Sequence, residues 1–224
     1  SGWKAVVFDL YNTLLFMKRG RSPSPWFKVW RAVRRSEGGA GFDAARAGLF
    51  ALTHDLPPTV CVEQAVAEQL PDFAAGVHEV LKAQSFEEEV LDEANTVELY
   101  EEVREVLEGL KARGLKLGLV SNLATPYGRA LAICGIEDLF DAVLCSFVEG
   151  VAKGQPGDSR IYERAAASLG VDLGHCLFVG DSVKADYEEA CAAGMNAVHL
   201  DRGLASAAQA ERPTIATLRE LQPR

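Results

Sequence analysis

The sequence predicts an α/β fold, a doubly wound parallel sheet with an α-helical cap inserted near its start. From residue 100 onward, short apolar runs of strand length alternate regularly with stretches of helical periodicity. This alternation is typical of a parallel sheet covered by helices on both faces. Between residues 16 and 95 the periodicity is helical only. We therefore expect a core formed by residues 1–15 and 96–224 and a helical cap domain formed by residues 16–95.

The first predicted strand ends at an aspartate. Val6, Val7 and Phe8 form an apolar run, and Asp9 follows directly at the start of a turn. Ligands of open α/β sheets bind at the carboxyl ends of the strands. A carboxylate at this place can act as a nucleophile on a bound substrate, so Asp9 is the first candidate catalytic residue.

The inserted segment has four stretches of helical periodicity, separated by glycine and proline residues. It leaves the core just after Asp9 and returns before the second strand. We therefore expect it to stand over the strand ends as a cap that excludes water. The four expected helices are Trp26–Arg35, Asp43–His54, Thr59–Leu70 and Phe73–Leu91.

The remaining elements follow in regular order. A helix over Tyr100–Arg113 carries its apolar residues on one face, and Gly114 ends it. The elements expected after it are a strand Leu115–Ser121, a helix near Tyr127–Cys134, a strand Ala142–Ser146, a helix Ser159–Leu169, a strand Cys176–Gly180, a helix Val183–Ala193 and a strand Asn196–Leu200.

Composition limits the partners. The 224 residues carry a formal net charge of −9, which argues against nucleic acid or an anionic membrane as a partner. An anionic small molecule would have to be captured locally.

The cysteines and the apolar runs bear on the compartment. The five cysteines have no metal-ligand spacing and lie in or beside apolar runs, which indicates a reducing cytoplasm. No apolar run approaches about 18 residues and no basic leader precedes one, so we expect neither a membrane span nor a signal peptide. The oligomeric state is not predicted.

Four groups of polar residues follow successive predicted strands. They occur in Phe8-Asp9-Leu10-Tyr11-Asn12-Thr13-Leu14, Leu119-Val120-Ser121-Asn122, Gly150-Val151-Ala152-Lys153 and Phe178-Val179-Gly180-Asp181-Ser182-Val183-Lys184-Ala185-Asp186. In order and placement, these motifs together resemble those of the haloacid dehalogenase superfamily. The resemblance spans nearly the whole chain. It implies a Rossmann-like core, an aspartate nucleophile and, in this subgroup, a helical cap inserted after the first motif.

The residue types fit the roles that the resemblance implies. Asp9 would attack the substrate and form a covalent intermediate, which divides a hydrolysis into two displacements. Thr13 and Ser121 offer hydroxyl donors and Asn122 an amide to orient the transferred group. Lys153 would place an ammonium beside Asp9 and offset charge on the substrate. A solvated loop lysine is the alternative interpretation of Lys153.

The last motif predicts a metal site. Three carboxylates crowded together would repel one another unless a divalent cation lay among them. Mg2+ fits, with Asp9, Asp181 and the main-chain carbonyl of Tyr11 as ligands and Asp186 anchoring a bound water or Lys153. The alternative is that Asp181 caps the following helix and Asp186 is a surface residue.

Tyr11 separates two possible reactions. Phosphatases of this superfamily carry an aspartate there that protonates the leaving group, and a phenol with a pKa near 10 replaces it poorly, at a cost of about a hundred- to ten-thousandfold in rate. The 2-haloacid dehalogenases of the superfamily carry Asp-x-Tyr-x-Thr, as this chain does at Asp9, Tyr11 and Thr13. They work without metal, however, and lack the Gly-Asp pair that is present here at Gly180 and Asp181.

The last motif involves more residues and decides the prediction. We expect magnesium-dependent hydrolysis of a small phosphorylated metabolite. The alternatives are a metal-independent 2-haloacid dehalogenase and a protein with weak or no catalysis that serves in binding or regulation. Acyl phosphates, phosphonates activated by a carbonyl, or alkyl phosphates that are hydrolysed slowly would reconcile Tyr11 with the metal site.

Two further features bear on the substrate. The first part of the expected cap is rich in lysine and arginine, and Arg31 is its candidate for holding an anionic substrate. Such a run is more often a solvated helix face. After Lys153 the loop is longer than is usual in the superfamily, and Gly154–Asp158 would alter substrate access.

Overall fold

The computed structural model describes residues 2–18, 78, 92, 94–123, 125–203 and 212–221. The four helices expected between residues 16 and 95, and Arg31 with them, lie outside the described residues. Among those that are described, no helix is both long and apolar enough to cross a lipid bilayer.

The core is a six-stranded sheet in the order β5-β4-β1-β6-β7-β8, and every neighbouring pair is parallel. This confirms the predicted doubly wound fold. The chain starts at the centre with β1, builds one half of the sheet and then returns to build the other. The strands are β1 (Ala5–Phe8), β4 (Lys116–Ser121), β5 (Ala142–Cys145), β6 (Cys176–Gly180), β7 (Asn196–Leu200) and β8 (Thr214–Ile215).

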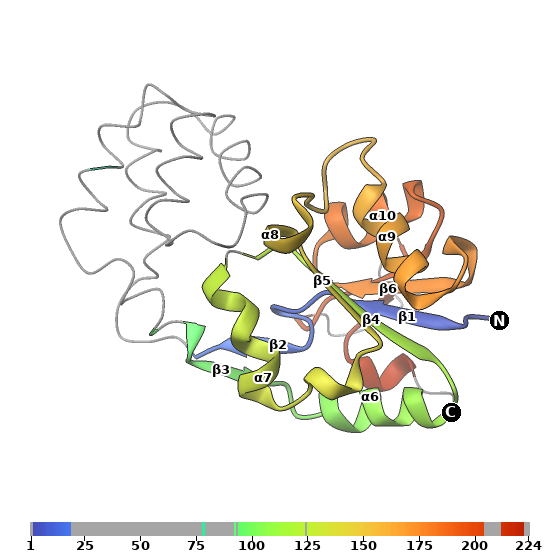
Figure 1. The fold of residues 1–224 in the computed structure, drawn as a ribbon. Helices are drawn as coiled ribbons and strands as arrows, with labels where there is room; N and C mark the ends of the chain where they lie inside the picture. Colours follow the sequence, from blue (N-terminus) through green and yellow to red (C-terminus); the bar gives the residue numbers. More distant parts are fainter. Residues whose placement is uncertain are drawn as a thin grey trace.

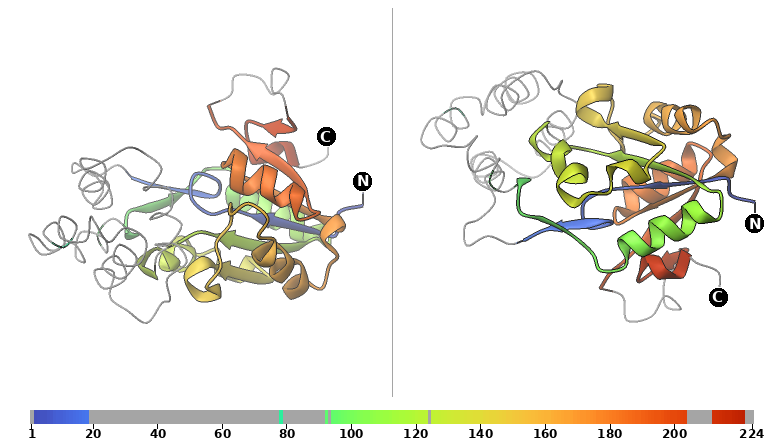
Figure 2. Two further views of the ribbon diagram at one scale, coloured as in Figure 1. Left: turned by 90° about the horizontal axis from the view of Figure 1, so that it is seen from above. Right: turned by 60° about the horizontal axis from the view of Figure 1, so that its bottom comes forward.

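Helices cover both faces of the sheet, so β1 is buried on both sides. Val6 and Phe8 belong to one apolar cluster, with residues of α6, whereas Ala5 and Val7 belong to a second, with residues of α9. Figure 1 shows α6 and α9 on opposite sides of the sheet, and Figure 2 shows the C-terminal 3-10 helix Leu218–Leu221 beside α6. The α-helices are α6 (Val103–Ala112), α7 (Ala130–Cys134), α8 (Ser146–Glu149), α9 (Arg160–Leu169) and α10 (Glu189–Ala192).

A second, two-stranded sheet joins the ends of the inserted segment. β2 (Leu15–Met17) pairs antiparallel with β3 (Val97–Leu99). The sequence analysis expected no strands here, because three residues are too few to show an alternating pattern. This short ribbon lies to the left of α6 in Figure 1.

Several helices differ from their predicted form. The helix expected over residues 183–193 is a π-helix, Val183–Glu188, followed by α10. The one expected near residues 127–134 begins as a 3-10 helix, Thr125–Arg129, and continues as α7. The short α8 was not expected. Each of these segments begins shortly after the end of β4, β5 or β6, and tertiary context can override local helix propensity.

Candidate active site

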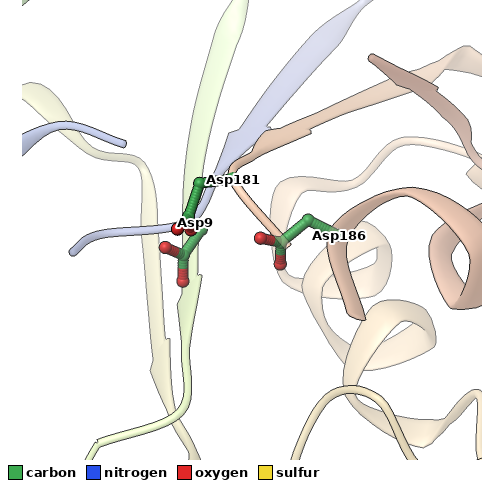
Figure 3. Close-up of side chains that lie close together, drawn as sticks. All are labelled: Asp9, Asp181 and Asp186. Carbon is green, nitrogen blue, oxygen red and sulfur yellow. The ribbon is translucent and has the colours of Figure 1, made fainter. Parts of the chain in front are cut away.

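Three carboxylates meet at the carboxyl ends of neighbouring strands. Asp9 follows β1, Asp181 follows β6, and Asp186 lies in the π-helix after it. One oxygen from each can be chosen so that all three lie within 4.8 Å of one another. Figure 3 shows Asp186 directing its carboxylate toward the other two.

Lys153 lies between two of these carboxylates. Its Nζ is 2.6 Å from Asp9 Oδ1 and 2.6 Å from Asp186 Oδ1, and its side chain is 3% exposed. A solvated loop lysine is therefore excluded. The main chain reaches this position after α8 ends at Gly150, whose φ of 64° is in the left-handed region that glycine adopts readily.

Asn122 holds Lys153 in place through the main chain. Its Nδ2 donates to the Lys153 carbonyl at 3.0 Å, and its Oδ1 accepts from the Lys153 N–H at 2.8 Å. The sequence analysis assigned this amide to the transferred group. In the structure both of its ends bind the Lys153 backbone, so Asn122 acts on the site by positioning the lysine.

Two hydroxyls orient the Asp9 carboxylate. Ser121 Oγ donates to Asp9 Oδ1 at 3.2 Å, and Thr13 Oγ1 donates to Asp9 Oδ2 at 3.4 Å. Ser121 is the last residue of β4, and Thr13 lies in the turn after β1. Both hydroxyls, expected to contact the transferred group, bind the expected nucleophile here.

Asp186 is fully enclosed, with 1% of its surface exposed. It accepts the Ser182 N–H at 2.9 Å, while Ser182 itself caps the π-helix by accepting from Ala185 N. This excludes the alternative in which Asp181 is the helix cap and Asp186 a surface residue. A Cβ on Gly180 would lie 2.2 Å from Asp186 Oδ2, so this packing requires glycine at position 180.

The electrostatics of the site are unbalanced. Burial raises the pKa of Asp181, and the charge of Asp9 raises it further. Burial likewise raises the pKa of Asp186, against the opposing effect of Lys153. Burial alone would lower the pKa of Lys153, but the charges of Asp186 and Asp9 outweigh it and the net direction is upward. One ammonium thus lies among three carboxylates and contacts two of them, an arrangement that favours a further cation.

The sequence matches the family described as haloacid dehalogenase-like hydrolase over residues 3–194. The chain belongs to this family. It is 30% identical over 208 residues to a phosphoglycolate phosphatase from Yersinia pestis, covering 89% of this chain and 82% of that protein. It is also 42% identical over 106 residues to a phosphatase from Mycobacterium tuberculosis, covering 46% of each, so the chain matches about half the length of that relative.

Solved structures of the haloacid dehalogenase-like family share the fold. A phosphatase from Thermococcus onnurineus is 25% identical, with a TM-score of 0.61 and coverage of 97% of this chain and 95% of that one. A 2-haloacid dehalogenase from Pseudomonas syringae is 21% identical, with a TM-score of 0.62 and coverage of 98% and 96%. The fold is thus common to both reactions that Tyr11 and the last motif suggest.

Tyr11 packs against the segment that follows β4. Its ring meets the Tyr127 ring edge to face, with centroids 5.9 Å apart, and its hydroxyl lies 3.5 Å from the Tyr127 carbonyl oxygen. At this distance the hydrogen bond is weak. The role of the Tyr11 carbonyl as a metal ligand stays a prediction.

Sequence analysis missed two residues around the Asp9 turn. Asn12 has a φ of 62° and donates from Nδ2 to Asp181 Oδ2 at 3.2 Å. Arg202 donates to the carbonyls of Asn12 and Thr13. Arg202 comes shortly after β7, so the reasoning from strand ends that singled out Asp9 and Asp181 would have pointed to it too.

Proposed function

We propose that the chain is a phosphatase that uses Asp9 as nucleophile, requires Mg2+ and hydrolyses a small, anionic phosphorylated metabolite. The observation that carries the proposal is the group of three carboxylates within 4.8 Å of one another. Phosphoryl transfer needs charge neutralisation of the kind that a bound cation provides. The phosphatase names of the two relatives support the same reaction class.

The residues present fit Mg2+. Carboxylate oxygens are the donors that this ion prefers. We assign Asp9, Asp181 and the Tyr11 carbonyl as direct ligands. Asp186 binds Lys153 through Oδ1 and the Ser182 N–H through Oδ2, so we assign it an indirect part, through Lys153 or a water. When bound, Mg2+ would offset charge on the phosphoryl oxygens.

The chain's own residues account for two displacements. An Asp9 oxygen bonds to phosphorus while the bond to the leaving oxygen breaks, and the departing group takes a proton from solvent water. A water molecule then attacks phosphorus and gives a proton to the solvent while the bond between Asp9 and phosphorus breaks, which releases inorganic phosphate and restores the Asp9 carboxylate. Lys153 offsets the charge near Asp9, and Ser121 and Thr13 keep the carboxylate oriented.

The second candidate function is that of a 2-haloacid dehalogenase, which Tyr11 favours because a halide leaves without a proton. The carboxylate group speaks against it, since a cation on Asp9 would weaken its attack on a neutral carbon. One set of assays separates the two. Phosphate release is followed with a panel of phosphorylated metabolites and halide release with 2-chloropropionate, each with Mg2+ or with a chelator, and with Asp9→Asn as the control.

The assay outcomes are distinct. Phosphate release that the chelator and Asp9→Asn both abolish is expected. Halide release that the chelator leaves unchanged would replace the proposal with the dehalogenase. No release of either product by a folded protein would indicate the binding or regulatory role instead.

A second variant tests whether Tyr11 only limits the rate. Tyr11→Asp restores an acid at this position, so phosphate release from alkyl phosphates should rise by up to about a hundredfold. Aryl phosphates whose leaving groups need no proton serve as the control and should change little. If alkyl phosphates gain nothing, the missing acid is not what limits the enzyme.

The cysteines support a reducing compartment, and we propose the cytoplasm. Four of them are free thiols in the described part of the chain: Cys134, Cys145, Cys176 and Cys191.

A further inference from the structure

Arg202 connects the nucleophile turn to the rest of the core. Its guanidinium donates from Nη2 to the Thr13 carbonyl at 2.6 Å and from Nε to the Asn12 carbonyl at 3.2 Å. Its third nitrogen, Nη1, lies 2.7 Å from Glu102 Oε1. A planar group with fixed donors can hold three acceptors at once, which a lysine cannot do in the same geometry.

The two carbonyls that Arg202 binds belong to residues whose side chains reach the site. Asn12 donates to Asp181 and Thr13 donates to Asp9. These two carboxylates are the ones we assign as direct metal ligands. Arg202 is therefore connected to Asp181 through Asn12 and to Asp9 through Thr13. In each case it binds the main-chain carbonyl of the residue whose side chain donates to the carboxylate.

The turn has an uncommon backbone conformation, which Arg202 helps to hold. Asn12 has a φ of 62°, in the left-handed region that few residues other than glycine adopt, although asparagine does so more readily than most. Asn12 N also donates to the Leu15 carbonyl at 2.7 Å, which closes the turn on itself. Arg202 ties this closed turn to the segment that follows β7, as Asn12 Nδ2 ties it to Asp181 after β6.

Arg202 is itself held rigidly. Glu102, which is 5% exposed, accepts from Arg202 and, at 3.3 Å, from Thr217 Oγ1. The guanidinium carbon lies 3.5 Å from the centre of the Tyr100 ring, and such stacking fixes the plane of the group. Arg202 is thus placed before any ligand arrives.

We propose that Arg202 is a positioning residue that fixes the Asn12–Thr13 turn and thereby presents Asp9 and Asp181 to the metal ion and the phosphoryl group. The inference rests on the proposed function, because it assigns Arg202 a task in the same site. The competing explanation is that Arg202 and Glu102 form an ion pair that stabilises the fold and leaves the site unaffected.

Arg202→Met tests the proposal, and Arg104→Met is the matched control. Arg104 also donates to two main-chain carbonyls, those of Cys134 and Gly135, outside the site. Mg2+ binding without substrate is measured by calorimetry, kcat and KM by phosphate release, and folding by circular dichroism and thermal unfolding. Groups that orient metal ligands typically account for about 10- to 100-fold in metal affinity or activity.

We expect folded Arg202→Met to bind Mg2+ about tenfold or more weakly and to lose kcat by a similar factor. Arg104→Met should stay within about twofold of the wild type, the range expected of a site without influence on the ligands. Folded Arg202→Met with wild-type Mg2+ affinity and kcat would overturn the proposal, as would equal losses in both variants.

Arg202→Lys covers the case in which Arg202→Met does not fold. A lysine at this position can still pair with Glu102, so the fold should be retained. It cannot hold the Asn12 and Thr13 carbonyls in the same geometry, so Mg2+ affinity should still fall. Mg2+ affinity equal to that of the wild type would then overturn the inference. A wild-type protein that binds no Mg2+ would instead overturn the proposed function itself, and this inference with it.

Discussion

Two cation–carboxylate groups flank the nucleophile turn, and they differ in what the cation touches. Lys153 contacts the carboxylates of Asp9 and Asp186 directly. Arg202 pairs with Glu102 and otherwise donates to main-chain carbonyls. The Lys153 side chain is 3% exposed and that of Arg202 19% exposed, so both are largely withdrawn from water.

The contacts suit the two cations to different tasks, Lys153 to the chemical step and Arg202 to the geometry of the site. An ammonium is a compact charge with rotatable donors, suited to a place where charge builds up during a reaction. A guanidinium is a planar fork, suited to holding a backbone in one conformation. Removal of the lysine should therefore affect mainly the chemical step, and changes around the arginine should act through the shape of the site.

Lys153→Met should have the largest effect. It leaves Asp9 and Asp186 buried without their shared cation, and loss of one charged donor in a site typically lowers kcat by about a hundred- to a thousandfold. Breaking a buried pair also lowers the free energy of unfolding by about 3 kcal/mol. Phosphate-release kinetics and urea unfolding measure the two effects.

The exposed Lys116, which pairs with Asp141 at 3.2 Å, supplies the control. Lys116→Met removes a surface ion pair and should cost less than about 1 kcal/mol. If Lys153→Met retained wild-type kcat, the direct contact with Asp9 would have no part in the reaction, and the contrast with Arg202 would fail.

Gly180→Ala should have the next largest effect, because it displaces the Asp186 carboxylate that pairs with Lys153. The added Cβ would lie 2.2 Å from Asp186 Oδ2 and 2.6 Å from Asp186 Cβ, so the side chain must move. Overpacking of this kind costs about 1–3 kcal/mol, and displacement of Lys153 by about 1 Å should lower kcat by about a hundredfold. Gly174→Ala, where a Cβ meets no atom within 4 Å, is the control.

A Gly180→Ala variant with unchanged kcat would show that the site tolerates movement of Asp186. Thermal unfolding would distinguish that tolerance from general loss of fold. Either result bears mainly on Lys153, since the added Cβ meets Asp186, which contacts Lys153 and makes no contact with Arg202.

The central strands were predictable from sequence because they are buried on both faces. Such strands appear as continuous apolar runs, and the predicted bounds of β6, which is buried throughout, coincide with those observed. The predicted bounds of β7 coincide as well, although that strand is only partly buried. The ribbon strands β2 and β3 and the short α8 contain three or four residues each. Elements of this length carry no periodic signal, and tertiary contacts determine them.

The candidate site was predictable to the extent that its residues follow strands. Asp9, Ser121 and Asp181 were found by that rule, and the structure brings them together with Lys153. Arg202 was missed because the rule was applied to the strand ends before β7 and not to β7 itself, and its contacts with main-chain carbonyls gave no separate signal. Glu102 was missed because, in sequence, it resembles any acidic residue near the start of a helix.

Glu102→Gln should have a smaller effect that depends on pH. Burial works to raise the pKa of Glu102, but the hydrogen bond and charge of Arg202 outweigh it, and the net direction is downward. A lowered pKa stabilises the folded state above the unfolded value near 4.5 and loses that contribution as pH falls through the folded pKa. The wild type should therefore exceed Glu102→Gln by about 1 kcal/mol at pH 7 and by progressively less in acid.

Urea unfolding between pH 3 and 7 measures this convergence. A stability difference between the two proteins that stayed constant with pH would show that Glu102 contributes by packing, and that its charge does not hold Arg202.

Asp181→Asn should have the smallest effect on stability, and with the opposite sign. Asp181 accepts a hydrogen bond from Asn12, whose carbonyl Arg202 binds. Burial and the charge of Asp9 raise the pKa of Asp181. A carboxyl with a raised folded pKa destabilises the fold above that pKa, and the penalty disappears as pH falls below the unfolded value of 3.8. In chelator, the variant should therefore unfold about 2–4 °C higher than the wild type at neutral pH, with a gain that shrinks as pH falls toward 3.8. Asp158→Asn is the control, because the hydrogen bond from Arg160 lowers the pKa of Asp158 and removal of that charge should give no gain.

The same scans with Mg2+ complete the test of Asp181→Asn. The ion should raise the unfolding temperature of the wild type but not of Asp181→Asn. If Asp181→Asn were less stable than the wild type in chelator, the hydrogen bond from Asn12 would stabilise the fold more than the repulsion between Asp181 and Asp9 destabilises it. The Arg202 side of the turn would then contribute more to the stability of the site than the raised pKa of Asp181 implies.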